Sequence, residues 1–245
     1  MGDIADFERM KKESIERMGS DSAFRAQSLN WLNESAKHKY SYHFSWLGLP
    51  VIQYPEDLVA LQEIVWAVQP DVIVETGIAR GGSLVFYASL LKLLGKNGLV
   101  IGIDVDIRPH NRAAIDAHAL RSGIAMVEGS SISRQVVDEV ARLARGRGRV
   151  LVVLDSNHTE AHVLQELELY SPLVTKDCYL VVFDTLIDDM PDDLVQNRPW
   201  GRGNNPKTAV REFLQRRDRF VIDKEIEHKL LITVAPDGYL KCIKD

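Results

Sequence analysis

Two apolar runs joined by a glycine-containing turn and a helical pattern constrain the fold of this chain most. In order, they are Val72–Val74, the acid Glu75, a turn with Gly77, Gly81, Gly82 and Ser83, a helical pattern over Leu84–Leu94, and the run Leu99–Ile103 that ends in Asp104. This order predicts strand, turn, helix and strand, the repeating unit of a parallel sheet. We expect a ligand at the carboxyl edge of that sheet, where open α/β sheets bind ligands.

The glycine turn is consistent with two interpretations. Glycines let the backbone approach a ligand closely, but a tight turn without a ligand uses the same residues. The spacing of Gly77, Gly81 and Gly82 does not match G-x-G-x-x-G, so the dinucleotide fingerprint is not met. The acid Asp104 at the end of the second strand favours a ligand, because carboxylates accept hydrogen bonds from ribose hydroxyls.

Three more predicted strands also end in acids. They are Ile124–Val127 before Glu128, Val150–Leu154 before Asp155, and Cys178–Phe183 before Asp184. Together with Glu75 and Asp104, these residues line one edge of the sheet with carboxylates. Such a pocket favours a cationic ligand.

The expected fold class is α/β, with a mostly parallel seven-stranded sheet and helices on both faces. We predict the last two strands at Phe220–Ile222 and Lys229–Ala235, followed by a turn at Pro236–Gly238 and the end of the chain at Tyr239–Ile243. The sheet should finish with an antiparallel, hairpin-like strand. Two helices are predicted within Asp3–Lys39. We therefore divide the chain into an N-terminal helical extension, 1–45, and an α/β domain, 46–245. The extension could cap the active site or join subunits, or it could simply pack on the sheet.

Two irregular segments are candidates for the substrate site. The aromatic stretch Tyr40–Pro55 is either a wall of that site, with His43 pointing inward, or a packed connector. About 20 residues without apolar periodicity separate the fifth strand from a helix at Thr208, and loops of that length are uncommon in compact domains unless they are functional or disordered. We predict that this loop, which contains Trp200, is a substrate lid; the alternative is a mobile surface loop.

Composition excludes several classes of protein. A chain of 245 residues can bury a core without disulfides or structural metals. Its net charge of −5 argues against nucleic-acid binding. No apolar stretch approaches the roughly 20 residues of a membrane span, and the charged N-terminus does not resemble a signal peptide. We expect Cys178 and Cys242 to be reduced core residues of a cytoplasmic protein.

Several motifs together carry a family resemblance. E-T-G-I-A-R-G-G-S, G-I-D-V-D-I-R-x-H-N, E-G-S-S, L-D-S-N-H-T and G-x-G-N-N-P-K-T-A-V resemble the cephalosporin hydroxylase family. Despite its name, that family consists largely of class I methyltransferases that depend on S-adenosylmethionine (SAM), including rhamnosyl and antibiotic O-methyltransferases. The resemblance covers Tyr40 to Ile243 and implies a Rossmann-like class I methyltransferase fold with SAM as cofactor.

The resemblance also implies roles for individual residues. Glu75 and Gly77 would form the cofactor turn, Gly81, Gly82 and Ser83 would lie beside the methionine or ribose portion, Asp104 would bind the ribose, and Ser130 or Ser131 would lie near adenine. The alternative for the two serines is to cap the following helix.

Asp155 and Asp184 match the strand ends that supply carboxylates to Mg²⁺ in metal-dependent relatives. Mg²⁺ takes oxygen ligands and keeps several waters. The residue before Asp184, often an acid in those relatives, is Phe183 here. The sequence therefore leaves Mg²⁺ open, with Asp188 or Asp189 as substitute ligands from the loop.

His158, three residues after Asp155, is the candidate general base. A neutral imidazole can take the proton of a hydroxyl as the methyl group moves. We assign catalysis to His158 with Asp155; the alternative is that His158 caps the following helix or binds Asp155.

The expected function is SAM-dependent O-methylation of a hydroxyl on a sugar or glycosylated natural product by a homo-oligomer. Two alternatives stay open: an NAD(P)-dependent sugar oxidoreductase or epimerase, and a non-catalytic cofactor-binding protein of a biosynthetic cluster. The oxidoreductase alternative is disfavoured because the sequence has no evident Y-x-x-x-K catalytic pair. An iron oxygenase is discounted, because no 2-His-1-carboxylate set is evident.

Overall fold

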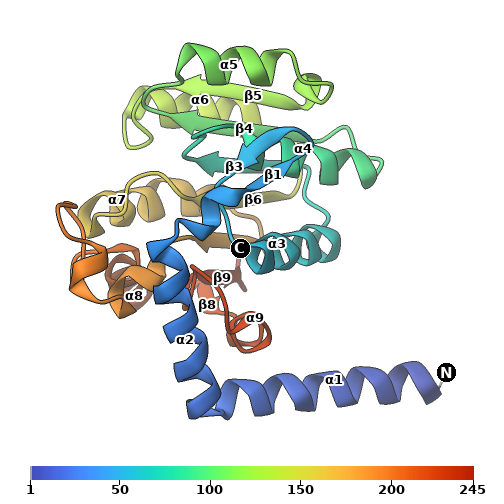
Figure 1. The fold of residues 1–245 in the computed structure, drawn as a ribbon. Helices are drawn as coiled ribbons and strands as arrows, with labels where there is room; N and C mark the ends of the chain where they lie inside the picture. Colours follow the sequence, from blue (N-terminus) through green and yellow to red (C-terminus); the bar gives the residue numbers. More distant parts are fainter. Residues whose placement is uncertain (1) are drawn as a thin grey trace.

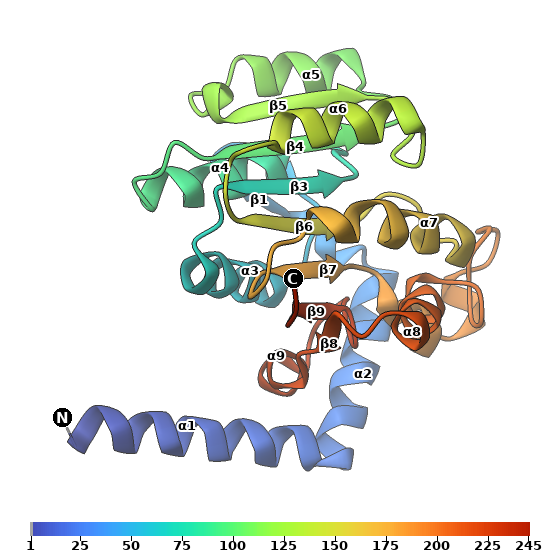
Figure 2. The same ribbon diagram turned by 180° about the vertical axis from the view of Figure 1, so that it is seen from behind.

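The computed structural model describes residues 2–245, and a central sheet with helices on both faces dominates it (Figure 1). The helices are α1 (Gly2–Ser20), α2 (Ser22–Lys37), α3 (Pro55–Val68), α4 (Gly82–Leu93), α5 (Pro109–Asp116), α6 (Arg134–Ala144), α7 (Glu160–Tyr170), α8 (Pro206–Arg216) and α9 (Lys224–Leu230). The strands are β1 (Phe44–Trp46), β2 (Leu49–Val51), β3 (Val72–Thr76), β4 (Leu99–Asp104), β5 (Ile124–Glu128), β6 (Val150–Leu154), β7 (Tyr179–Val182), β8 (Phe220–Ile222) and β9 (Tyr239–Cys242). Helices α3 and α4 cover one face of the sheet, and α6 and α7 cover the other (Figure 2).

The central sheet has seven strands in the order β5-β4-β3-β6-β7-β9-β8. Its strands run parallel except β9, which is antiparallel to both of its neighbours. The short apolar strands β3, β6 and β7 are buried along their whole length, as expected for parallel strands covered on both faces. Thr76 is in register with Ile103 and with Leu154, so these strands end level at one edge. The predicted seven-stranded α/β fold is confirmed.

One strand prediction is wrong. Lys229–Ala235 forms no strand; α9 ends at Leu230, and the seventh strand is β9. Asp223 starts α9 by accepting a hydrogen bond from the backbone of Glu225 at 3.2 Å. The backbone N–H of Val234, just beyond, donates to the buried carboxylate of Asp57 at 3.0 Å and not to a neighbouring strand. The apolar run therefore has its polar groups satisfied outside the sheet.

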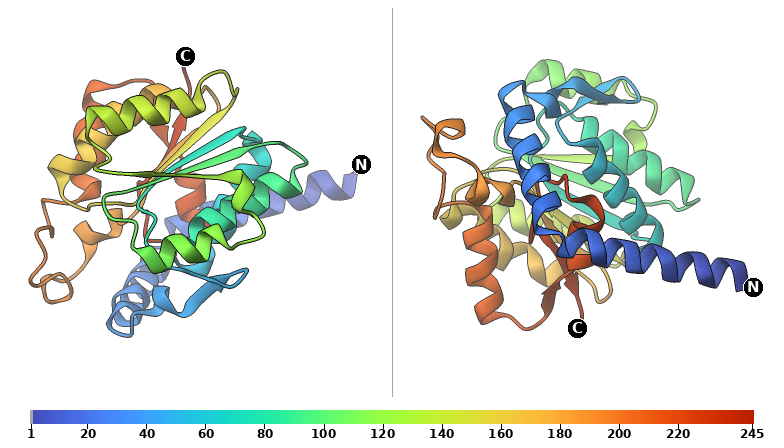
Figure 3. Two further views of the ribbon diagram at one scale, coloured as in Figure 1. Left: turned by 90° about the horizontal axis from the view of Figure 1, so that it is seen from above. Right: turned by 60° about the horizontal axis from the view of Figure 1, so that its bottom comes forward.

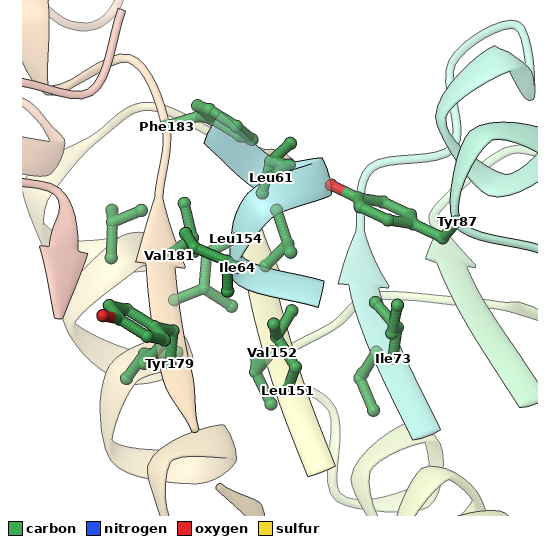
Figure 4. Close-up of a cluster of buried hydrophobic side chains, with 14 of the residues drawn as sticks. Leu61, Ile64, Ile73, Tyr87, Leu151, Val152, Leu154, Tyr179, Val181 and Phe183 are labelled. Atoms are coloured by element: carbon green, nitrogen blue, oxygen red, sulfur yellow. The ribbon is translucent and has the colours of Figure 1, made fainter. Parts of the chain in front are cut away.

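The core fills the space between the sheet and α3 (Figure 4). Leu61 and Ile64 of α3 face side chains from β6 and β7, and Tyr87 reaches in from α4. Phe183, directly after β7, belongs to this cluster and is 2% exposed. The position next to Asp184 is thus a core position, which explains its apolar side chain.

The aromatic stretch after α2 forms a short hairpin, β1–β2, rather than a purely irregular connector. The indole N–H of Trp46 donates to the hydroxyl of Ser89 on α4 at 3.0 Å, which fixes the hairpin against the main domain. His43 is exposed, packs edge-on against Tyr40 and is not among the residues that line the cavity described below, so the alternative in which it points inward is wrong. Tyr42, its neighbour, lines the cavity described below.

The two helices predicted within Asp3–Lys39 are α1 and α2 (Figure 3). Asp21 caps α2 by accepting a hydrogen bond from the backbone of Phe24 at 2.9 Å. The C-terminal part of α1 lies against α9, where a Cβ atom at Gly19 would overlap the ring of His228. The other end of α1 points away from the sheet (Figures 1 and 2). Among residues 2–245, no helix is both long and apolar enough to cross a membrane.

Candidate active site

A cavity of about 350 Å³ opens at the carboxyl edge of β3, β6 and β7. The end of β3, the turn after it and the start of α4 contribute Glu75, Gly77, Gly82 and Ser83. The segments that follow β6 and β7 contribute Asp155, His158 and Asp184. The stretch from Pro50 to Gln53, at the end of the hairpin, forms a further wall. One cavity therefore joins the predicted cofactor turn to the predicted metal and catalytic residues.

The glycine turn is packed too tightly for side chains at two positions. Gly77 has φ +94°, and a Cβ atom there would lie 2.0 Å from the backbone oxygen of Asp155. A Cβ atom at Gly82 would lie 2.2 Å from the backbone oxygen of Pro50. The first glycine brings the turn against the end of β6, and the second lets the hairpin close over the start of α4.

Glu75 is buried at the floor of this cavity. It accepts a hydrogen bond from the hydroxyl of Ser83 at 2.6 Å. Burial, opposed by that hydrogen bond and reinforced by the charge of Asp104, raises the pKa of Glu75 to about 8. At neutral pH an empty site therefore holds a mostly protonated Glu75, and a cationic ligand would favour its ionised form.

This raised pKa makes a prediction for stability. The folded protein holds a proton on Glu75 that the unfolded chain loses near pH 4.5, so Glu75 lowers the free energy of unfolding as pH rises from about 4.5 to about 8. Relative to wild type, Glu75→Gln should gain stability across that window, by at most about 5 kcal/mol. Urea unfolding of both proteins at pH 5 and pH 8.5 measures this gain, with Glu128→Gln, which removes an exposed acid at the end of β5, as the control. If the difference in unfolding free energy between Glu75→Gln and wild type were the same at pH 5 and at pH 8.5, the raised pKa of Glu75 would be contradicted.

Asp104, Gly81, Ser130 and Ser131 do not line the same cavity. The carboxylate of Asp104 accepts hydrogen bonds from the backbone of Ile78 and Ala79, at 2.9 and 3.2 Å. These two bonds hold the backbone of the glycine turn in place. The role of Asp104 toward a ribose stays a prediction. The N-cap of α6 is Ser133, so neither Ser130 nor Ser131 has the capping role that was their alternative.

Ser131 belongs to a buried polar cluster that sequence analysis missed. Its hydroxyl lies 3.0 Å from Nε2 of His162, and its carbonyl accepts a hydrogen bond from the Tyr170 hydroxyl at 2.7 Å. Nearby, Glu166 accepts a hydrogen bond from Ser156 at 2.7 Å. The spacing of His162, Glu166 and Tyr170, four residues apart along α7, was the available signal. The cluster connects the end of β5 to the residue after Asp155.

Asp155, His158 and Asp184 come together as the sequence predicted. One ligand atom from each lies within 4.8 Å of the others. Nε2 of His158 is 3.3 Å from Oδ2 of Asp184. Burial, followed by the charge of Asp184, raises the pKa of Asp155 well above its usual range. Two carboxylates this close are stabilised by a cation or a shared proton between them.

The donor set of this cluster fits a divalent cation. Two carboxylates supply the oxygen ligands that Mg²⁺ takes, and the open cavity leaves room for waters. The loop acids do not supplement it: Asp188 accepts a hydrogen bond from Asn205 at 2.8 Å and pairs with Arg211, while Asp189 pairs with Lys207. Asp155 and Asp184 would therefore hold the metal, with His158 beside them.

The loop after β7 is fastened at several points. Asp188 also accepts a hydrogen bond from the backbone of Gly203 at 3.0 Å, and Asn204 accepts one from the backbone of Glu160 at 3.0 Å. These bonds bring Trp200 edge-on to His158, with ring centroids 4.9 Å apart. The loop thus contacts the histidine through Trp200, and its first residues are buried in a 3₁₀ helix. Its role as a substrate lid stays a prediction.

Comparison with known proteins agrees with this geometry. Residues 38–243 match the family described as rhamnosyl O-methyltransferase/CmcI. The rhamnosyl O-methyltransferase of Mycobacterium tuberculosis (strain ATCC 25618 / H37Rv) is 30% identical over 199 residues, which are 80% of this chain and 77% of that protein. Its counterpart in Mycobacterium leprae is 28% identical over 148 residues, covering 60% and 62% of the two chains.

Solved structures share the fold. A structure of CmcI with Mg and SAM superposes with a TM-score of 0.58 at 19% identity, covering 83% of this chain and 78% of that one. An O-methyltransferase from Bacillus cereus in complex with SAH superposes with a TM-score of 0.53 at 13% identity, covering 89% and 91%. The resemblance noted in the sequence and the class I methyltransferase fold are both confirmed. The chain belongs to the rhamnosyl O-methyltransferase/CmcI family.

Proposed function

We propose that this protein is a SAM-dependent O-methyltransferase that acts on a hydroxyl of a sugar or glycosylated natural product. One observation carries the proposal: the glycine turn with Glu75 and the cluster of Asp155, His158 and Asp184 line the same cavity. A methyl donor on the turn would lie beside groups that can hold and deprotonate a hydroxyl.

The reaction breaks the S–CH₃ bond of SAM and forms a CH₃–O bond to the acceptor, whose hydroxyl proton must leave. Asp184 beside Nε2 of His158 favours the tautomer with its proton on Nε2. Nδ1 then carries the lone pair that takes the acceptor proton. The edge of Trp200 on His158 holds the ring in place and helps exclude water.

A bound divalent cation would polarise the acceptor oxygen and lower the pKa of its hydroxyl. Asp184→Asn is therefore expected to remove most of any stimulation of methyl transfer by Mg²⁺, because it takes away one of two carboxylates. Initial rates measured against Mg²⁺ concentration, with an EDTA baseline, test this.

The matched control is Asp188→Asn. Asp188 is an acid of the neighbouring loop, but Arg211 and Asn205 occupy its carboxylate. We expect Asp188→Asn to keep the Mg²⁺ response. Equal Mg²⁺ responses in wild type and Asp184→Asn would remove Asp184 from the metal site.

The sugar acceptor is supported by the family and by the polar lid. Rhamnosyl O-methyltransferases are the curated relatives at 28–30% identity. The test is transfer of labelled methyl from SAM to a panel of rhamnosides, other glycosides, simple phenols and catechols. Turnover with glycosides but not with the phenols supports the proposal. Turnover with catechols alone would overturn the sugar assignment.

The two alternative functions make different predictions for the same panel. A non-catalytic cofactor-binding protein would bind SAM and methylate none of the acceptors. An NAD(P)-dependent sugar oxidoreductase would need a dinucleotide at the turn, whose glycine spacing does not match that fingerprint. Family membership favours methyl transfer over both.

Three further features stay proposals. We propose that residues 1–45 act as a helical extension of an α/β domain spanning 46–245. We propose a cytoplasmic location, supported by the two cysteines, Cys178 and Cys242, which are free and buried. We also propose that the protein is a homo-oligomer.

A further inference from the structure

Two buried polar side chains in the active-site cavity have hydrogen-bonding groups without a partner. We call the part of the cavity lined by the buried side chains of Gln53, Leu61, Glu75 and Tyr87 the inner end. Gln53, just after β2, is 6% exposed, and Tyr87, on α4, is 1% exposed. Among residues 2–245, neither the amide nitrogen of Gln53 nor the hydroxyl of Tyr87 has a hydrogen-bond partner. Buried polar groups without partners are rare, so these two indicate a ligand.

Gln53 can act only as a donor in the cavity. Its side-chain oxygen accepts a hydrogen bond from the backbone N–H of Tyr54 at 3.1 Å, and this bond determines which end of the amide is left free. The free end is the NH₂ group, which donates and cannot accept. The end of the hairpin that carries Gln53 is held against α4, where a Cβ atom at Gly82 would overlap the backbone oxygen of Pro50.

Tyr87 supplies a second donor. Its hydroxyl points from α4 toward Leu61 of α3 (Figure 4). Burial, followed by the charges of Glu75 and Asp155, raises the pKa of Tyr87 well above its usual range. The phenol therefore stays protonated, and its O–H can donate to an acceptor atom in the cavity.

The chemistry of the inner end suits a zwitterion. Two neutral donors suit the oxygens of an anion, and the carboxyl of Glu75 suits a cation. An anion alone would be repelled by Glu75 and Asp155, whereas an α-amino acid brings its own ammonium group to Glu75. SAM carries such a group at its methionine end, and a sugar hydroxyl does not. Leu58 and Leu61 wall this end with buried apolar surface, and apolar surroundings strengthen polar contacts.

We propose that Gln53 and Tyr87 donate hydrogen bonds to the α-carboxylate of SAM while Glu75 accepts one from its ammonium group. Both residues lie outside the glycine turn, and they would select a methyl donor that carries a complete amino acid. Their role depends on the SAM-dependent function proposed above. Arg80 also lines the cavity, but it is exposed, and an exposed ion pair contributes little.

Decarboxylated SAM tests the carboxylate contact, because it keeps the adenosine, the sulfonium and the amine and lacks only the carboxylate. Calorimetric titration of both donors, without acceptor, gives the preference of each protein for SAM over decarboxylated SAM. Tyr87→Phe should lower that preference about 10–100-fold, the usual contribution of a hydrogen bond to a charged group. Its KM for SAM should rise while kcat changes little, because the lost contact is made equally in the ground state and the transition state.

Gln53→Glu reverses the contact. The variant keeps the oxygen that accepts from Tyr54 and replaces the NH₂ donor with a carboxylate oxygen. It should weaken SAM binding more than Tyr87→Phe does, because two carboxylates then face each other, and it should bind decarboxylated SAM at least as tightly as wild type does. A side chain that only packs in the cavity wall would shift the affinities of both donors equally.

Tyr54→Phe is the matched control. Tyr54 is also buried, but its hydroxyl lies 2.8 Å from the hydroxyl of Ser35, and Tyr54 does not line the cavity. This variant should melt at a lower temperature than wild type and keep the preference for SAM, because it loses a satisfied hydrogen bond away from the ligand. Tyr87→Phe should show the opposite pattern, with an undiminished melting temperature in the absence of ligand and a reduced preference for SAM.

Two results would overturn the role of Gln53 and Tyr87. One is a Tyr87→Phe protein that keeps the wild-type preference, or that loses affinity for both donors equally. The other is a preference that survives Tyr87→Phe and Gln53→Glu but is lost in Arg80→Gln, which would move the carboxylate to Arg80. If wild type binds SAM and transfers its methyl group in the same experiments, only this role fails. A wild type that binds no SAM would remove the proposed function as well.

Discussion

Replacing His158 with alanine is expected to slow methyl transfer by about 10²–10⁴-fold, the usual contribution of a general base. SAM affinity should be unchanged, because the contacts of His158 are with Asp184 and Trp200 and not with the glycine turn. Some activity should remain, since positioning of donor and acceptor contributes independently of the base. Steady-state rates with saturating acceptor, together with calorimetric titration of SAM, measure both quantities.

His43→Ala is the control for this experiment. His43 is an exposed histidine of the hairpin region that does not line the cavity. We expect that variant to keep both activity and SAM affinity. Full activity in His158→Ala, with unaltered SAM affinity, would remove His158 from the mechanism.

Gly77→Ala is expected to disrupt both the fold and the cofactor turn. A Cβ atom there would approach the backbone oxygen of Asp155 to 2.0 Å, and the residue has φ +94°. Strained backbone costs about 1–3 kcal/mol and overpacking costs a similar amount. We expect a melting temperature lower by roughly 5–20 °C and no measurable SAM binding. Thermal unfolding with and without SAM provides the measurement.

Gly48→Ala separates backbone strain from steric clash. Gly48 has the same φ of +94° at the tip of the hairpin, but no atom lies within 4 Å of the Cβ position. Gly48→Ala should lower the free energy of unfolding only by the backbone strain, about 1–3 kcal/mol, and should keep SAM binding. If both variants lose equal stability and both bind SAM, the close contact between the turn and β6 is not needed for SAM binding.

Much of the fold was predictable because parallel strands have a strong local signature. The runs before Glu75, Asp104, Asp155 and Asp184 are short, apolar and bounded by turn residues, and each is a strand of the central sheet. The error at Lys229–Ala235 has a different origin. Its apolar residues suit a strand, but the cap at Asp223 and the buried Asp57, 177 residues away from Val234, decide the local structure. Such long-range contacts are not visible in a local pattern.

The part of the candidate site that lies directly after the strands was predictable from the sequence. Asp155, His158 and Asp184 meet because β6 and β7 are neighbours in the sheet. The roles assigned to these residues, and to Glu75, Gly77, Gly81, Gly82, Ser83, Asp104, Ser130 and Ser131, remain predictions. The contacts of Trp200 and His162 depend on loop and helix packing, which sequence spacing alone does not determine.

Calorimetric titration of SAM, S-adenosylhomocysteine and NAD⁺, each with Mg²⁺ and with EDTA, tests the central claim most directly. The account predicts binding of the first two at micromolar concentrations and none of NAD⁺. Because Glu75 has a pKa raised to about 8, SAM binding at pH 7 should also release a proton, seen as a dependence of the heat on the buffer. Binding of NAD⁺ alone would contradict the account and make a sugar oxidoreductase the better explanation of the same cavity.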